Sequence, residues 1–226
     1  MNLATQPIIR HAAQPTRKHT FMGLVLTIDP SVLVPRSETE LLGNVAIEAL
    51  RQISGALRVV DMCCGSGNLT CAIATAVPQA HVWAADISHD SVNLARRNAQ
   101  DHALQERVEV VQGDLFGSLP ATLAGSIDMV VCNPPYMSSK RVDERHDLHL
   151  EPRQAFDGGP YGLTIHGRVA TEATSFLKPG GTLLFEIGLG QHKQAQRILE
   201  RAGAYDNLEF IRNDAGEVRV ISAIRK

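Results

Sequence analysis

The sequence contains few of the residues that hold metal ions or disulfide-rich folds together. It has only four cysteines, namely Cys63, Cys64, Cys71 and Cys132. Two of them are adjacent, and none stands in a C-x-x-C or Cys/His ligand spacing. The nearest pair of histidines, His146 and His149, has no third ligand close to it in sequence. We therefore expect free thiols, most of them buried, and no metal site.

The chain also lacks long hydrophobic runs and an excess of positive charge. No apolar run approaches the roughly 20 residues that a membrane-spanning helix needs, and the first residues show no secretory signal. Lysine and arginine number 22 against 24 aspartates and glutamates, which gives a net charge of -2. No global positive field is therefore available to hold a long nucleic acid. These absences predict a soluble, cytoplasmic protein that binds no membrane, and they disfavour nucleic acid as a partner.

The 226 residues are 44% hydrophobic, which suits one domain with a full core at about 150 residues per domain. Residues 1–20 show no apolar periodicity, so we expect a flexible lead-in there. Residues 21–226 are expected to form the domain. At its start, residues 24–36 indicate a strand or hairpin that leads into a helix. Ser37 and Glu40 fit a capping box for this helix.

From residue 57 onward, short apolar runs alternate with amphipathic stretches. We expect strands over residues 57–63, 80–87, 107–114, 126–133, 181–188, 207–212 and 217–224. We expect helices over residues 68–77, 89–103, 167–177 and 191–203. This alternation predicts an α/β fold with a mostly parallel, seven-stranded sheet covered on both faces. The last two strands predict a C-terminal hairpin that puts an antiparallel strand into the sheet.

A glycine-rich turn follows the first of these later strands. Gly65 and Gly67 lie between an apolar run and a helix, where glycine lets the backbone turn sharply and approach a ligand. Any tight strand-to-helix turn favours glycine, so this motif is weak by itself. Thr70 replaces the third glycine of the dinucleotide-binding G-x-G-x-x-G motif. A ligand smaller than a dinucleotide is therefore favoured.

Two more strand ends carry residues suited to a nucleoside. Asp86 ends the second strand of the alternating series, where an acid accepts hydrogen bonds from the two hydroxyl groups of a ribose. The competing role is a helix cap, for which Ser88 is equally well suited. The third strand ends at Gly113, and Asp114 and Leu115 follow it. Asp114 is able to bind an adenine amino group, and Leu115 is able to pack on the ring.

Asn133, Pro134, Pro135 and Tyr136 directly follow a buried strand and form the most specific motif. Two prolines fix φ and exclude a helix, so we expect the loop to hold its side chains rigidly. Methylation of a planar, weakly nucleophilic nitrogen requires acceptors for its NH2 group and a flat surface beside it. The Asn133 side-chain oxygen and the Pro134 carbonyl are such acceptors, and Tyr136 offers the surface. The competing role is an ordinary rigid turn.

These motifs together resemble the class I S-adenosylmethionine-dependent methyltransferases, and among them the protein-(glutamine-N5) methyltransferases of peptide chain release factors. Besides NPPY, the similarity includes VPRSETELL, EPRQAFDGG, LKPGGTLLFEIG and DAGEVRV, and it extends from about Phe21 to the C-terminus. It implies a Rossmann-like fold, S-adenosyl-L-methionine as the methyl donor and a release-factor glutamine as the acceptor. We expect direct in-line transfer to a held nitrogen, without a dedicated base.

The resemblance also implies roles for individual residues. The catalytic loop would be Asn133 to Tyr136. The implied cofactor contacts are Asp61, Cys63, Cys64, Gly65, Ser66, Gly67, Asp86, Ile87, Asp114, Leu115 and Asn133. The Cys63-Cys64 pair departs from the glycine and threonine that are usual in this turn of the family. Because the pair keeps the residues small, we expect cofactor binding to survive.

Further expectations concern the acceptor. Bacterial members of the family carry an N-terminal helical domain that helps to dock the release factor, whereas about 20 mixed residues precede the core here. Shorter eukaryotic and archaeal relatives rely on a small partner protein, so a partner subunit is one option. The charged segment 137–163 is expected to cover the substrate. Glu151, Arg36 and Glu38 are expected either at the pocket mouth or in surface ion pairs.

Other functions are open at this stage. The same core could methylate a small molecule or a natural-product intermediate, or an exocyclic amine of a base in RNA or DNA. The net charge of -2 and the single tryptophan argue against a nucleic acid. A non-catalytic cofactor-binding module is another class, which an intact NPPY loop argues against. A dehydrogenase on the same fold is disfavoured by Thr70.

Overall fold

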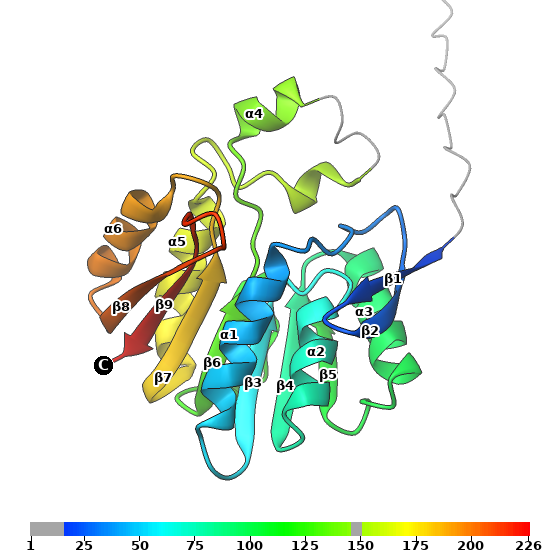
Figure 1. The fold of residues 1–226 in the computed structure, drawn as a ribbon. Coiled ribbons are helices and arrows are strands. Elements are labelled where there is room, and N and C mark those ends of the chain that lie inside the picture. The colour runs from blue at the N-terminus through cyan, green and yellow to red at the C-terminus, as the bar shows by residue number, and fades with distance from the viewer. Residues whose placement is uncertain (1–15, 146–150) are drawn as a thin grey trace, which may run out of the picture.

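A seven-stranded sheet forms the centre of the protein (Figure 1). The structure is a computed structural model that describes residues 16–145 and 151–226. The strands, in their order across the sheet, are β5 (Val108–Gln112), β4 (Ala80–Asp86), β3 (Leu57–Met62), β6 (Ile127–Cys132), β7 (Leu177–Glu186), β9 (Val218–Arg225) and β8 (Tyr205–Arg212). Strands β3 to β7 run parallel, and β9 runs antiparallel to both β7 and β8. The expected α/β fold with its C-terminal hairpin is therefore confirmed.

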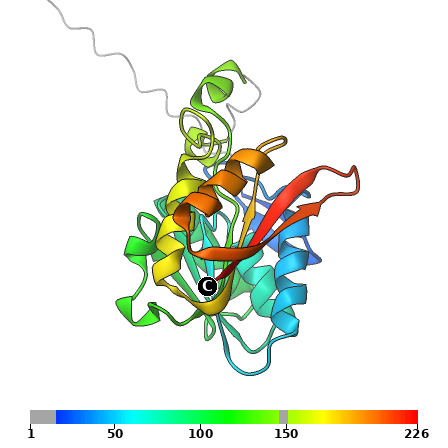
Figure 2. The same cartoon turned by 90° about the vertical axis from the view of Figure 1, so that its left-hand side faces the viewer.

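Helices cover both faces of this sheet, as Figures 1 and 2 show. The helices on one face are α1 (Thr39–Arg51), α2 (Asn68–Ala76) and α3 (His89–Asp101). Those on the other face are α5 (Thr164–Glu172) and α6 (His192–Ala202). Three short 3-10 turns lie on the same face, namely η1 (Leu115–Ser118), η2 (Ala121–Leu123) and η5 (Ala173–Ser175). No helix in the described ranges is long and apolar enough to cross a membrane.

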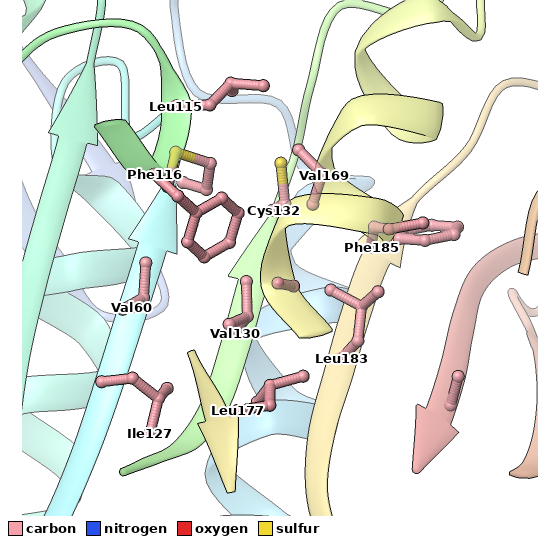
Figure 3. Packing of buried hydrophobic residues seen from close by; sticks show 14 of the residues in the cluster. Val60, Leu115, Phe116, Ile127, Val130, Cys132, Val169, Leu177, Leu183 and Phe185 are labelled. Atoms are coloured by element: carbon pink, nitrogen blue, oxygen red, sulfur yellow. The ribbon is translucent and has the colours of Figure 1, made fainter. Parts of the chain in front are cut away.

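Two apolar clusters fill the spaces between the sheet and its helices. Neighbouring residues of a strand point to opposite faces, so Val59 packs in one cluster and Val60 in the other. Figure 3 shows the second cluster, in which Val130 and Leu183 of the sheet meet Val169 of α5. All five of these side chains are at most 1% exposed. This fixed core holds the carboxyl ends of the strands in place.

The α5 region differs from its expected boundaries. The helix expected from residue 167 begins at Thr164, ends at Glu172, and is followed by η5. The strand expected from residue 181 begins already at Leu177, because Leu177 pairs with Ile127 across a bulge in the ladder. Such pairing between distant segments is not visible in local periodicity.

A small antiparallel hairpin precedes the main fold. Strand β1 (Arg17–Phe21) pairs with β2 (Leu24–Ile28), so the expected flexible lead-in of residues 1–20 is wrong for its last residues. Residues 1–15 lie outside the described ranges. Asn98 of α3 explains the order, because its side chain receives the Thr27 N–H (2.8 Å) and donates to the carbonyls of Thr27 and Ser66, both at 2.9 Å.

The expected capping box at the start of α1 is not formed. No side chain caps this helix end; the backbone N–H of Glu40 donates to the Ser37 carbonyl at 3.1 Å. The Glu40 carboxylate instead accepts the backbone N–H of Met22 in the hairpin turn at 3.1 Å. The tertiary contact therefore replaces the local one.

The segment after β6 stands above the sheet in Figure 1 and contains α4 (Ser139–Glu144) and the turn η4 (Arg153–Ala155). Residues 146–150 lie outside the described ranges, and with them His146 and His149. The end of the segment returns to the NPPY loop, where the Met137 N–H donates to the Phe156 carbonyl (2.9 Å) and the Gly158 N–H to the Met137 carbonyl (2.8 Å).

Candidate active site

A cavity of about 480 Å³ lies at the carboxyl ends of the parallel strands. The chain moves outward from β3 to β5 and then returns to the other side of β3 with β6. Ligands of open α/β sheets bind at such a reversal of strand order. The predicted residues that line the cavity are Cys63, Gly65, Asp86, Ile87, Asp114, Leu115, Asn133 and Pro135. Residues that are far apart in sequence are thus brought to one place.

Only some residues of the glycine-rich turn after β3 line the cavity. Cys63 has φ +61° and Gly67 has φ +75°, a region that residues other than glycine seldom adopt. A Cβ on Gly67 would lie 3.0 Å from the Ala95 Cβ, so this position also needs a small residue. Of the predicted turn contacts, Cys63 and Gly65 line the cavity, whereas Cys64, Ser66 and Gly67 do not.

Asp86 lines the cavity and also fixes the turn. Its carboxylate accepts the backbone N–H of Gly65 and the backbone N–H of Ser88, each at 2.9 Å. Ser88 caps α3 by accepting the Ser91 N–H at 3.3 Å, as the sequence suggested. Burial raises the pKa of Asp86, and the backbone hydrogen bonds oppose this rise. Asp86 is therefore an acceptor at the cavity wall rather than the cap of α3.

Asp61 is buried behind the turn and does not line the cavity. Its Oδ2 accepts the Thr70 backbone N–H (3.0 Å) and the Thr70 hydroxyl (2.5 Å), which anchors the first turn of α2. Its Oδ1 has no hydrogen-bond partner within the described ranges. Burial raises the pKa of Asp61 to about 7 despite the bonds from Thr70. Thr70, which replaces the glycine of the dinucleotide motif, thus has a structural partner.

Asp114 is paired with a residue that the sequence did not single out. Arg168 of α5 donates to Asp114 at 2.8 Å and pairs with Glu172 at 3.0 Å. Arg168 and Ile165, both on α5, line the cavity, as does Leu115. Leu115 has φ +48° and is buried. This end of the cavity is thus an apolar slot with an ion pair at its edge.

The NPPY loop separates this cavity from a smaller one of about 40 Å³. Asn133, Pro134 and Tyr136 line the smaller cavity, together with Arg36 and Phe156. Asn133 Nδ2 donates to Thr39 Oγ1 at 2.9 Å. No N–H or O–H of the described segments donates to Asn133 Oδ1 or to the Pro134 carbonyl. Both acceptors are therefore free within the described segments, Asn133 on a residue that lines both cavities and Pro134 on one that lines the smaller cavity.

Glycines support the NPPY loop from behind. A Cβ on Gly158 would lie 2.5 Å from the Pro135 carbonyl oxygen, and one on Gly162 would lie 2.3 Å from the Tyr136 carbonyl oxygen. Gln191 Nε2 also donates to the Tyr136 carbonyl at 2.8 Å. The glycines that follow EPRQAFD are therefore needed for close packing of backbone on backbone.

The segment before α1 and the segment around Glu151 contact each other beside the cavity. Glu151 forms an ion pair with Arg36 and accepts the Val34 N–H at 2.8 Å. The same two segments contribute Leu33 and Pro152 to the cavity lining, which sequence reasoning had missed. Arg36 and Glu151 thus form a link across the mouth of the site. Glu38 lies outside this link and accepts a hydrogen bond from the Ser37 hydroxyl at 3.3 Å.

All four cysteines are free, and three of them are buried, as the sequence predicted. Burial raises the pKa of Cys64 and Cys132 and brings that of Cys71 to about 12. These thiols are therefore poor nucleophiles at neutral pH. The described ranges hold no group of three side chains that could bind a metal ion.

The sheet order, the pocket at its reversal and the comparisons define the chain as an S-adenosylmethionine-dependent methyltransferase. The methyltransferase small domain family matches residues 40–150. A release factor glutamine methyltransferase of Gloeobacter violaceus is 37% identical over 201 residues, which are 88% of this chain and 68% of that protein. This chain belongs to the release factor glutamine methyltransferase family.

One further relative and one solved structure are also similar to this chain. The ribosomal protein uL3 glutamine methyltransferase of Francisella tularensis is 33% identical over 78% of this chain and 56% of that protein. The N-terminal domain of human METTL16, solved in complex with SAH, has a TM-score of 0.65 at 16% identity, covering 89% of this chain and 76% of that one. The structural likeness confirms the fold.

Proposed function

We propose that this chain transfers the methyl group of S-adenosylmethionine to the side-chain amide nitrogen of a glutamine in a peptide chain release factor. The observation that carries the proposal is the pair of free acceptors, Asn133 Oδ1 and the Pro134 carbonyl, on two residues of the smaller cavity, of which Asn133 also lines the larger one. One cavity suits a nucleoside-sized ligand, and the other suits a narrow planar group. The cofactor would supply an electrophilic methyl group, and the chain would supply position.

The large cavity fits the cofactor in size and in its distribution of groups. Asp86 offers carboxylate oxygens for ribose hydroxyls at the end of β4. Leu115 and Ile165 offer apolar surface for the adenine ring. Asp114 is proposed to bind the adenine amino group, with Arg168 holding its carboxylate in place. Cys63 and Gly65 would line the methionine part, where a small side chain leaves room.

Asp61, Cys64, Ser66 and Gly67 would then act indirectly. They shape the turn from behind, since none of them lines the cavity. Ile87, by contrast, lines it and has an exposed fraction of 54%, as expected for an apolar residue that a bound ring covers.

The small cavity fits an amide. Two acceptors bind the two N–H groups of a carboxamide. The face of the nitrogen that carries the lone pair is then open to the methyl donor. Tyr136 lines the same cavity and would supply the flat surface. A cavity of about 40 Å³ admits the end of a side chain more readily than a purine ring. This favours glutamine over a flipped base.

Proton removal needs no dedicated base at this site. No aspartate, glutamate or histidine of the described segments lines the small cavity. The acceptor nitrogen becomes acidic only as its bond to carbon forms, so its proton is able to leave late to water. Positioning and exclusion of water would therefore provide most of the rate enhancement.

The relatives bear on which glutamine is the acceptor. Several are named for release factors, and one is named for ribosomal protein uL3. Both names describe glutamine methylation of a protein of translation, and the release factor is the more frequent. We place the enzyme in the cytoplasm on the same ground.

The test is transfer of labelled methyl from S-adenosylmethionine by the purified chain alone. Release factors, ribosomal protein uL3, bulk tRNA and rRNA, and a small-molecule extract are offered in parallel. We expect label on a release-factor glutamine, located by mass spectrometry of peptides. Label only on uL3, RNA or a small molecule would contradict the proposed acceptor. Activity that requires an added cell fraction would indicate a partner subunit.

A further inference from the structure

A further cavity, the α6 cavity of about 340 Å³, lies between α6 and the loop that precedes α5. Helix α6 lies beside α5 on one face of the sheet (Figures 1 and 2). Four residues of α6 line this cavity, namely Gln194, Arg197, Ile198 and Arg201. Their spacing of three or four residues puts them on one stripe of the helix. A different stripe, with Ala195 and Leu199, packs on the core. The α6 cavity is therefore formed by the outer side of the helix.

The α6 cavity adjoins the NPPY loop through Gln191, which lines the cavity. Gln191 Nε2 donates to the Tyr136 carbonyl at 2.8 Å, and Gln191 Oε1 accepts the Gly188 N–H at 2.8 Å. Tyr136 in turn lines the small cavity that is proposed to hold the acceptor amide. A protein whose glutamine occupies the small cavity would therefore have neighbouring segments beside the α6 cavity.

Two exposed apolar side chains flank the same loop. Tyr161, which also lines the α6 cavity, is 89% exposed, and Leu189 is 56% exposed. Each stands next to a glycine that packs on Tyr136. A Cβ on Gly162 would lie 2.3 Å from the Tyr136 carbonyl oxygen, and one on Gly188 would lie 3.2 Å from the Tyr136 ring. Large apolar side chains that are exposed together beside a site are typical of surfaces that bind another protein.

The α6 cavity carries positive charge without acidic partners. Arg197 and Arg201 line it one helical turn apart, and Lys193 lies one turn earlier on the helix. None of these three side chains forms an ion pair within residues 16–145 and 151–226. Glu200, the only acidic residue of α6, accepts a hydrogen bond from Gln196 at 2.8 Å. Because like charges one turn apart repel each other, an anion from outside the chain would stabilise this stripe.

The remaining lining includes apolar side chains. Leu163 is buried, and Ile198 packs against the core cluster. An apolar floor beside two arginines fits a peptide segment that carries carboxylates and an apolar side chain. A nucleic acid fits less well, because its phosphates need a series of cations along the backbone rather than an apolar floor.

We propose that the α6 cavity docks an acidic segment of the acceptor protein. An apolar side chain of that segment would pack against Leu163 and Ile198, beside Tyr161, and its carboxylates would pair with Arg197 and Arg201. The proposal rests on the function proposed above, since it takes the acceptor to be a protein. Such a contact lies outside the reacting groups, so it strengthens binding of the acceptor without changing the chemical step.

The test removes the two charges and measures methyl transfer to a release factor. Arg197→Gln combined with Arg201→Gln keeps good helix formers at both positions. We expect the KM for the release factor to rise by about tenfold or more, with kcat and the Kd for S-adenosylmethionine within about twofold. Added salt should raise the KM of the parent and change that of the variant much less. Tyr161→Ser, at an exposed position, should raise the KM by about three- to tenfold.

A matched control removes the same charge elsewhere. Arg51→Gln combined with Arg97→Gln changes two exposed arginines on α1 and α3, which cover the opposite face of the sheet. This variant should keep the KM of the parent to within about twofold. An equal rise of KM in both double variants would show an effect of net charge alone and would overturn the proposal.

Binding measured without turnover separates this proposal from the proposed function. The Kd of labelled release factor, from fluorescence anisotropy, should rise by about tenfold or more in the Arg197 and Arg201 double variant. A parental Kd and KM in that variant would overturn the docking site and leave the proposed function intact. Weaker binding of bulk tRNA, with an unchanged Kd for the release factor, would also overturn the docking site, because it would identify a nucleic acid site.

The parent protein supplies the remaining outcomes. A release factor that binds the parent but receives no methyl group would overturn the proposed function and leave the docking site intact. A release factor that neither binds nor is methylated would overturn both.

Discussion

Gly162 lies directly against the backbone of Tyr136: a Cβ at Gly162 would stand 2.3 Å from the Tyr136 carbonyl oxygen. The same oxygen accepts the hydrogen bond from Gln191, so moving it away would break this bond. The position of the NPPY loop thus depends on a glycine that lies 26 residues further along the chain.

Gly162→Ala should therefore displace the NPPY loop. We expect kcat to fall by about tenfold or more because the acceptor groups shift, while cofactor affinity changes less. Gly125→Ala is the matched control, since Gly125 shares a positive φ (65° against 73°) but has no atom within 4 Å of its Cβ position. Equal effects of the two substitutions on kcat would contradict the role of the contact.

Asp86→Asn should weaken cofactor binding before it affects the chemical step. A hydrogen bond to a charged group contributes about 1.5 to 3 kcal/mol, so we expect the Kd for S-adenosylmethionine to rise by roughly 10- to 100-fold. Isothermal titration measures this directly, with Asp128→Asn as the control for a buried carboxylate away from the cavity. An unchanged Kd would rule out the ribose assignment.

Asp61 should make the stability of the ligand-free protein depend on pH. Its pKa is raised from 3.8 to about 7 by burial, so the folded state keeps a proton that the unfolded state loses. The free energy of unfolding should fall as pH rises from about 4 to about 7, by an amount on the order of 4 kcal/mol. In Asp61→Asn, urea unfolding across this range should lack that part of the pH dependence. The same change of unfolding free energy with pH in both proteins would contradict the raised pKa of Asp61.

Glu151→Gln should loosen the link across the mouth of the site. The substitution removes the charge that pairs with Arg36 and weakens the bond to the Val34 N–H. We expect faster cofactor dissociation in stopped-flow experiments, by about two- to tenfold for a partly exposed pair. Glu144→Gln breaks an exposed ion pair with Lys140 on α4 and should leave the rate unchanged. The same rate in all three proteins would count against a link that retains the ligand.

Local patterns were sufficient where a residue acts through its own neighbours. The strand end at Asp86 and the cap at Ser88 depend on a few adjacent residues. Pro-Pro likewise restricts its own backbone, so the NPPY loop was recognisable. The mostly parallel sheet, covered on both faces, followed from the alternation of strands and helices, because parallel strands need crossover connections.

Long-range contacts account for what the sequence did not reveal. Glu40 binds Met22 instead of capping α1, and Arg168 reaches Asp114 from a helix 54 positions away. Thr39 stands in a motif that the sequence did single out, yet only the fold places its hydroxyl on Asn133. Asp61 was expected at the cofactor, but the structure buries it under α2. No periodicity encodes such pairings.

The most direct measurement is the rate of methyl transfer to a release factor by Asn133→Ala under single-turnover conditions, with the cofactor Kd measured on the same preparation. We expect the rate to fall by about 100-fold or more, because one of two acceptors for the amide is lost, and the Kd to stay within about threefold. A rate near that of the parent enzyme would contradict the claim that Asn133 holds the acceptor nitrogen.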